Sequence, residues 1–156
     1  MELEWLKSGI TPLKELISFL NKKSQTNNIH KKHLIMELRN NLNVFSNAFL
    51  NDVSYDTIID MLSNKAIQDA ISDNFNFRKL HPGTIRSSQI MDERNRKYLG
   101  WTAEKLVDKI DEKIVELRNI KKMNRGTVKQ VKNNIALMIS NLYFRMKLLG
   151  DLLKAS

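Results

Sequence analysis

The spacing of apolar residues is the feature that most constrains how this chain can fold. In five stretches they recur at alternating steps of three and four, which places them on one face of an α-helix. No stretch alternates apolar and polar residues between turn signals, as a half-buried strand would. The five apolar faces consist of Leu3, Leu6, Ile10, Leu13, Ile17 and Leu20; Ile35, Leu38, Leu42, Phe45 and Phe49; Ile58, Ile59, Leu62, Ala66 and Ala70; Ala103, Leu106, Ile110, Ile114 and Leu117; and Val128, Val131, Ile135, Met138, Leu142, Leu149 and Leu152. The sequence therefore predicts an all-α fold, a helical bundle of four long helices plus shorter helices.

Capping residues give expected boundaries for the first helix. Thr11 followed by Pro12 is typical of a helix start, because threonine caps the N-terminus and proline fits the first turn. We expect a short lead-in and then a helix from Pro12 to about Lys23. The apolar face continues through Gly9 and Pro12, so a single kinked helix is the alternative.

The later helices have similar signals. Ser54 is the expected N-cap of one helix that runs through Ala70, and Thr102 is the expected N-cap of the next long helix. Gly126 is expected at the C-cap that ends this helix, and Thr127 is expected to start the next one. The last helix is then expected to extend from Val128 for about 26 residues, or roughly 39 Å.

The segment between these helices, Phe75 to Trp101, is too long for a structureless loop inside a compact domain. We expect a crossover at about 75–101 that is partly helical. Ser88 is the expected cap of a short helix that ends before Gly100, and Pro82 with Gly83 forms a turn. Its aromatic rings are expected to anchor the crossover to the bundle rather than to form an exposed stacking surface.

Length and composition indicate one domain, residues 1–156, with a core that needs no covalent staple. The chain contains no cysteine, which excludes disulfides and thiolate metal sites. No apolar run is long enough for a membrane span, and the acidic N-terminal residues Glu2 and Glu4 do not fit a secretory signal. We therefore expect a cytoplasmic protein.

One side-chain group invites a metal hypothesis. His30, His33 and Glu37 are spaced so that they share one helical face. Lys31 and Lys32 flank them, and no second helix carries the further ligands that metal-binding bundles use. We predict neither a metal nor a cofactor, and no motif for nucleophilic or acid–base catalysis is present.

The formal charge of +9 is concentrated in two clusters. By contrast, residues 53–77 carry Asp56, Asp60, Asp69 and Asp73 against a single lysine. Clustered cations favour an anionic partner, although a solvated helix corner gives the same pattern. The predicted binding residues are Arg118, Lys121, Lys122, Arg125, Lys129 and Lys132 in the first cluster, and Arg78, Lys79, Arg86, Arg94 and Arg96 in the second.

These observations predict a non-enzymatic helical interaction module whose basic face engages an acidic partner protein or a nucleic acid. The alternative is a structural or regulatory subunit that acts through protein contacts or homo-oligomerisation. It depends on the last helix, whose apolar residues exceed one face, so that this helix is either central or faces a second chain. The residues outside its main face are Leu137, Ile139, Phe144, Met146, Leu148 and Leu153.

Overall fold

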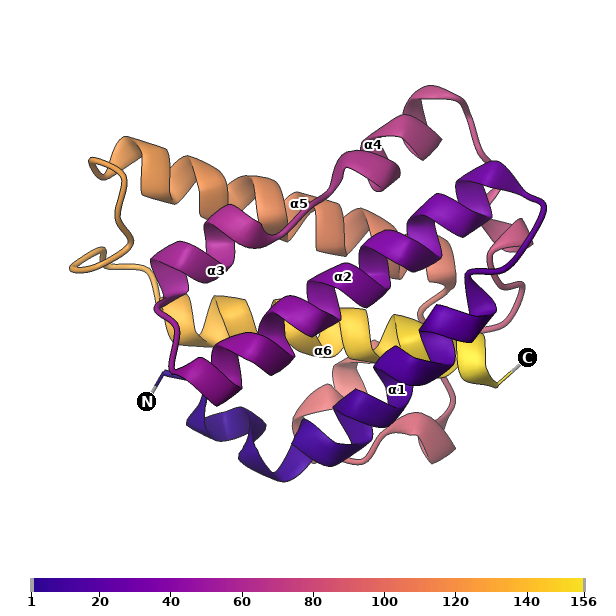
Figure 1. Ribbon diagram of the computed structural model, residues 1–156, viewed down its shortest axis with the longest axis horizontal. Helices are drawn as coiled ribbons and strands as arrows, with labels where there is room; N and C mark the ends of the chain where they lie inside the picture. The colour runs from indigo at the N-terminus through magenta and orange to yellow at the C-terminus, as the bar shows by residue number, and fades with distance from the viewer. Residues whose placement is uncertain (1, 156) are drawn as a thin grey trace.

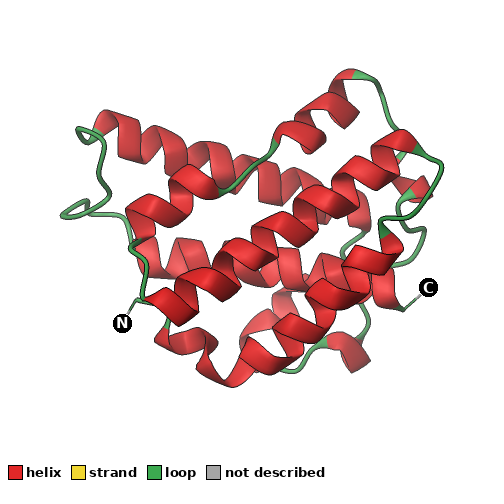
Figure 2. Ribbon diagram, in the orientation of Figure 1, coloured by secondary structure: helices red, strands yellow, loops and turns green. Residues whose placement is uncertain are grey.

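Helices account for all regular structure in residues 2–155, the part of the chain that the computed structural model describes (Figure 2). Thr84 and Thr102 form an isolated β-bridge, but this range holds no strand. The predicted all-α class is therefore confirmed. The α-helices are α1 (Ile10–Lys23), α2 (Ile29–Asn51), α3 (Tyr55–Met61), α4 (Lys65–Ser72), α5 (Ala103–Met123) and α6 (Ile135–Lys154). The 3-10 helices are η1 (Glu4–Gly9), η2 (Phe77–Lys79), η3 (Ser87–Gln89) and η4 (Glu93–Tyr98).

Helix α6 is the central element of the bundle. It crosses behind α2 in Figure 1 and packs against α1, α2 and α5. Gly150 lies so close to α1 that a Cβ atom there would fall 2.8 Å from a methyl group of Leu16. No helix in residues 2–155 combines the length and the apolar character that crossing a membrane requires.

The central position of α6 accounts for its excess of apolar residues. Ile139, Met146, Leu148 and Leu153 are buried within the chain, and Phe144 is half-buried against the core. Only Leu137, with 52% of its surface exposed, remains largely uncovered among the six residues outside the main face. A second chain is therefore not needed to bury the extra apolar residues of α6.

The first helix begins earlier than predicted. Helix α1 starts at Ile10, directly after η1, so Thr11 and Pro12 lie inside the first turn and Thr11 is not the N-cap. Pro12 is tolerated there because the first backbone N–H groups of a helix have no intrahelical acceptor. The structure thus resembles the kinked alternative more than a separate lead-in.

The predicted helix from Ser54 to Ala70 is in fact two helices, which corrects the sequence prediction. Ser54 caps α3 as expected, since its Oγ accepts a hydrogen bond from the Thr57 N–H. Helix α3 then ends at Met61, and α4 begins at Lys65. The apolar spacing persists across this break because Leu62 is buried between the two helices.

Two side chains of α2 fix the break between α3 and α4. The Asn41 carboxamide donates to the Ser63 carbonyl at 2.8 Å and accepts from the Ser63 N–H at 2.9 Å, which mimics a backbone pairing. The Glu37 carboxylate accepts from the Ala66 N–H at 2.7 Å and from the Ser63 hydroxyl at 3.0 Å, and more weakly from the Ile67 N–H. Glu37 therefore caps the N-terminus of α4 from a neighbouring helix.

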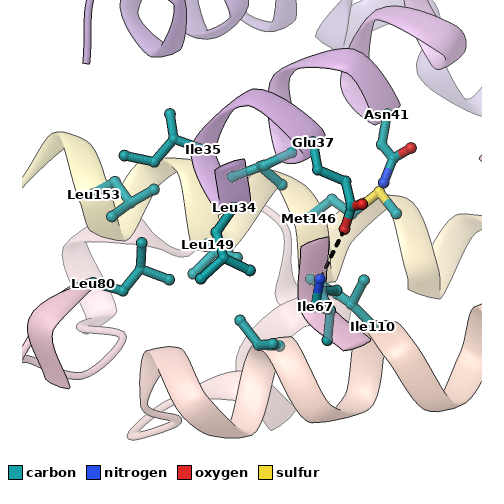
Figure 3. A pocket seen from close by; sticks show the side chains of 12 residues that line it. Leu34, Ile35, Glu37, Asn41, Ile67, Leu80, Ile110, Met146, Leu149 and Leu153 are labelled. Atoms are coloured by element: carbon teal, nitrogen blue, oxygen red, sulfur yellow. Dashed lines mark hydrogen bonds between the residues drawn. The ribbon is translucent and has the colours of Figure 1, made fainter. Parts of the chain in front are cut away.

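Figure 3 shows where this capping carboxylate lies in the core. Glu37 and Asn41 lie beside a cavity of about 20 Å³ whose other lining residues are mainly aliphatic, and a dashed line joins Glu37 to Ile67. Burial raises the pKa of Glu37, while its hydrogen bonds from Ala66, Ser63 and Ile67 act in the opposite direction. Glu37, which the spacing places on one helical face with His30 and His33, is thus buried in the core.

The last helix begins later than predicted. Residues 124–134 form an irregular loop, and Asn134 caps α6 by accepting a hydrogen bond from the Leu137 N–H at 3.1 Å. Arg125, Gly126 and Gln130 have positive φ angles, which no helix contains. Val128 is buried as an anchor of this loop, which we call the 124–134 loop, and not as part of a helix.

The crossover at about 75–101 is packed and partly helical, as expected, but its helices differ from the prediction. Ser88 does not cap a helix that runs to Leu99. Instead, η3 and η4 are separate, and Asp92 caps η4 by accepting from the Arg94 N–H at 3.0 Å. Phe77 and Tyr98 are buried, which agrees with the expectation that the rings act as anchors.

We predict that Glu37 contributes to stability through its caps more than through its charge. Glu37→Ala leaves buried N–H groups without an acceptor and is expected to lower the free energy of unfolding by about 2 to 4 kcal/mol. Glu37→Gln keeps one carbonyl acceptor and is expected to cost less than about 1.5 kcal/mol. Urea denaturation of both variants measures the difference, and an equal loss in the two would contradict the capping role.

The raised pKa of Glu37 predicts a pH dependence. The folded state holds the Glu37 proton more tightly than the unfolded state, whose pKa lies near the ordinary value of 4.5. Protonation therefore stabilises the fold increasingly as pH falls from the raised pKa to about 4.5. As pH falls over this range, the free energy of unfolding of the wild type should rise relative to that of Glu37→Gln. A relative fall would contradict the prediction and show that the hydrogen bonds to the carboxylate outweigh its burial.

Candidate functional site

The first predicted cluster gathers at one end of the molecule. Its six residues, which we call the basic corner, are Arg118, Lys121 and Lys122 at the end of α5, and Arg125, Lys129 and Lys132 on the 124–134 loop. The α5 members line a groove of about 510 Å³ between α3 and α5. Gly126, Ile59 and Val115 complete much of its lining. This end of α5, with the loop that follows it, extends from the left side of the molecule in Figure 1.

Two members of the basic corner are engaged inside the protein. The Arg118 guanidinium donates to the Asn64 side-chain oxygen at 2.7 Å and to the Leu62 carbonyl. It thereby holds the segment between α3 and α4 from the α5 side. The Lys121 ammonium group lies 2.6 Å from the Asp60 carboxylate and donates to the Asp56 carbonyl at 3.1 Å. Arg118 and Lys121 therefore stabilise the fold through these contacts.

The 124–134 loop is held by a carboxylate of α3. Asp56 accepts hydrogen bonds from the Thr127 hydroxyl and the Val128 N–H, each at 2.6 Å. Asn124 spans the loop by donating to the carbonyl groups of Thr127 and Lys129. The backbone that carries the loop cations is thus fixed by several hydrogen bonds rather than extended freely into solvent.

Four members of the basic corner remain available. The side chains of Lys122, Arg125, Lys129 and Lys132 are exposed and make no hydrogen bond or ion pair with residues 2–155. The acidic residue of the groove lining, Asp60, is already paired with Lys121. The four side chains therefore present positive charge that the described part of the chain does not neutralise.

The second predicted cluster is more divided. Arg94 forms a close ion pair with Asp92 at 2.7 Å, and Arg96 lies 3.6 Å from Glu93. Hydrogen bonds from Arg94 hold the pKa of Asp92 below its ordinary value. The other members, Arg78, Lys79 and Arg86, are exposed and form no ion pair within residues 2–155.

The structure does not bring the two clusters together. Arg78 borders a pocket with Thr102 and Glu104, at the beginning of α5, whereas the basic corner lies at the end of that helix. With 21 residues, α5 is about 30 Å long, so one small ligand cannot contact both ends. The basic corner and the crossover cations are separate surfaces.

The crossover offers little aromatic surface for stacking on nucleic-acid bases. Tyr98 is 1% exposed and Phe77 is 6% exposed. Trp101 packs edge-on against Tyr98 at 4.9 Å, and the Lys105 ammonium group lies 4.5 Å from the centre of its indole ring. The rings therefore stabilise the fold, while the neighbouring cations face outward.

The histidine group does not converge on a common point. His30 lies 3.0 Å from the Asp73 carboxylate, whereas Glu37 turns into the core to cap α4. Within the described range, no three His, Asp or Glu side chains are close enough to hold a metal ion.

We predict that the members of the basic corner differ in their effect on stability. Arg118→Ala removes two hydrogen bonds to the break between α3 and α4 and is expected to cost about 1 to 3 kcal/mol. Lys122→Ala, one turn away on the same helix, is expected to change stability by no more than about 0.5 kcal/mol. Urea denaturation compares them, and equal effects would contradict the assignment of Arg118 to the fold.

Comparison with known proteins identifies no relative. No protein-family model matches the chain, and neither a curated protein nor a solved structure matches it significantly. The activity of the protein must therefore be inferred from its own residues.

Proposed function

We propose that this protein is a non-enzymatic interaction module that engages an acidic partner through the basic corner. The observation that carries the proposal is the set of four exposed cations, Lys122, Arg125, Lys129 and Lys132, without partners in residues 2–155. Cations that are close together and unpaired raise the local concentration of anions and accelerate association with them.

The fixed backbone of the 124–134 loop supports this proposal. Asp56 binds the loop at Thr127 and Val128, and these contacts are made before any partner arrives. Less conformational entropy is lost when a partner binds side chains on an ordered loop.

Exposed apolar side chains favour an acidic protein over a nucleic acid as the partner. Met123, next to Lys122, is 80% exposed, and Val115 contributes apolar surface to the groove between α3 and α5. An acidic protein segment with apolar side chains would gain from both the cations and this groove. Phosphate groups would gain only from the cations, and the buried rings of the crossover offer little base stacking.

We predict that charge reversal at the exposed cations weakens binding without unfolding the protein. The test variant is Lys122→Glu with Arg125→Glu and Lys129→Glu, which leaves Arg118 and Lys121 intact. The matched control reverses the exposed residues Lys14, Lys22 and Lys32 on α1 and α2, which changes the net charge equally. Fluorescence anisotropy with a leucine-containing glutamate-rich peptide, a DNA duplex and a single-stranded RNA measures binding at low salt.

At least one probe should bind the wild-type protein, and the test variant should lose at least about tenfold in affinity, or roughly 1.4 kcal/mol. The control variant should lose much less. If the duplex binds through all four cations, log K should fall against log salt with a slope of about −3.6. Tighter binding of the peptide supports an acidic protein. No binding by any probe, or equal losses in the two variants, would overturn the proposal.

A further inference from the structure

A second concave site lies away from the basic corner. It is a cleft of about 710 Å³ between the η1–α1 junction, the crossover and α6, and we call it the aromatic cleft. Its lining includes Trp5 from η1, Asn95 from η4, and Tyr143 and Phe144 from α6. This volume lies in the range of about 300 to 1,000 Å³ that is typical of small-molecule sites. No residue of the basic corner lines it.

Three rings form one side of the aromatic cleft. The centre of the Trp5 ring lies 5.4 Å from that of Tyr143 and 6.0 Å from that of Phe144, and the latter two are 5.2 Å apart. These rings come from opposite ends of the sequence and support one another. Mutually packed rings give a rigid apolar surface, against which a planar ring packs well.

A polar side chain in the same lining makes no hydrogen bond with the protein. Asn95 is 6% exposed, its carboxamide has no partner within residues 2–155, and the carboxamide still reaches solvent. The Tyr143 hydroxyl, by contrast, is fully buried without a hydrogen-bond partner. The Asn95 carboxamide can therefore exchange its contacts with water for hydrogen bonds to a ligand without breaking any bond of the fold.

The charges around the aromatic cleft are already balanced. Arg94 is paired with Asp92 at 2.7 Å, and Lys147 lies 2.9 Å from the Asp151 carboxylate. Glu93 lies 3.6 Å from Arg96. An uncharged ligand leaves all of these pairs in place and needs no further charge from the cleft. In this respect the cleft differs from the basic corner.

We infer that the aromatic cleft binds an uncharged heteroaromatic ring of the nucleobase type. The half-buried rings of Trp5 and Phe144 would contact the bound ring, with the buried Tyr143 supporting them, and the Asn95 carboxamide, which has one donor side and one acceptor side, would pair with its edge. Met91, which is 87% exposed and lines the cleft, supplies a flexible apolar side chain at the margin. This inference does not depend on the proposed function of the basic corner.

Nuclear magnetic resonance provides a site-specific test on the intact protein. The chain has two tryptophans, Trp5 and Trp101, so a ¹⁵N spectrum shows two indole N–H signals, which the variant Trp101→Phe assigns. Adenosine, guanosine, cytidine and uridine are titrated separately, and ribose is the control without a base. At least one nucleoside should shift the Trp5 signal saturably while the Trp101 signal stays in place, and ribose should shift neither.

Asn95→Leu provides the matched variant. It should weaken nucleoside binding at least tenfold, because it removes the donor and the acceptor that pair with the edge of the base. It should change stability little, because the Asn95 side chain makes no hydrogen bond with residues 2–155 and leucine has a similar size. A single-stranded oligonucleotide of the same base separates the two sources of such a ring. Weaker binding of the free nucleoside in Asn95→Leu assigns a small-molecule site, and weaker binding of the oligonucleotide alone assigns a base presented by a strand. No shift of the Trp5 signal by any probe, or binding that Asn95→Leu leaves unchanged, would overturn the inference.

Discussion

The hydrogen bonds from α2 to the break between α3 and α4 are the interaction on which the arrangement of the basic corner depends. Glu37 and Asn41 satisfy the backbone where the chain leaves α3 and enters α4. Arg118 completes this arrangement from α5. With the break fixed, α3 lies against α5, and its Asp56 can hold the 124–134 loop. A buried carboxylate in the core is thus linked, through α3, to the position of cations on the surface.

Repetitive features of the fold were predictable because they depend on local sequence. The apolar spacing of α2, α5 and α6 and the caps at Ser54 and Thr102 act within one or two helical turns, so the printed sequence contains them. The breaks were not predictable from the same information. Ser63 ends the α3 region because Asn41 pairs with its backbone, and that contact joins residues 22 positions apart. Apolar spacing continues across such a break and conceals it.

The clustering of cations near residue 120 was predictable from the sequence, but which of these cations lack an ion-pair partner was not. Lys121 and its partner Asp60 are far apart in sequence, so counting cations near residue 120 could not show that the acidic segment folds back onto them. The polarisation of charge along the sequence is therefore partly cancelled in space. The burial of Glu37 could have been inferred from the sequence. Glu37 and Asn41 are spaced i, i+4 on α2 and lie between leucines that are buried. A carboxylate that faces solvent would not be expected at that position.

The two surfaces differ in the groups that they offer, and this difference bears on what each can bind. Exposed cations at the basic corner cost little stability, because water solvates them, and they attract anions of many kinds. The Asn95 carboxamide in the aromatic cleft makes no hydrogen bond with residues 2–155 and still reaches solvent, so it offers one donor side and one acceptor side to a ligand. The rings that line the same cleft come from η1 and α6 and are held by the core itself. A free donor and acceptor next to a rigid apolar wall select a ligand by both its shape and its hydrogen-bonding groups. The aromatic cleft is therefore the more specific of the two surfaces, although its charges are balanced and its residues form no cluster along the sequence.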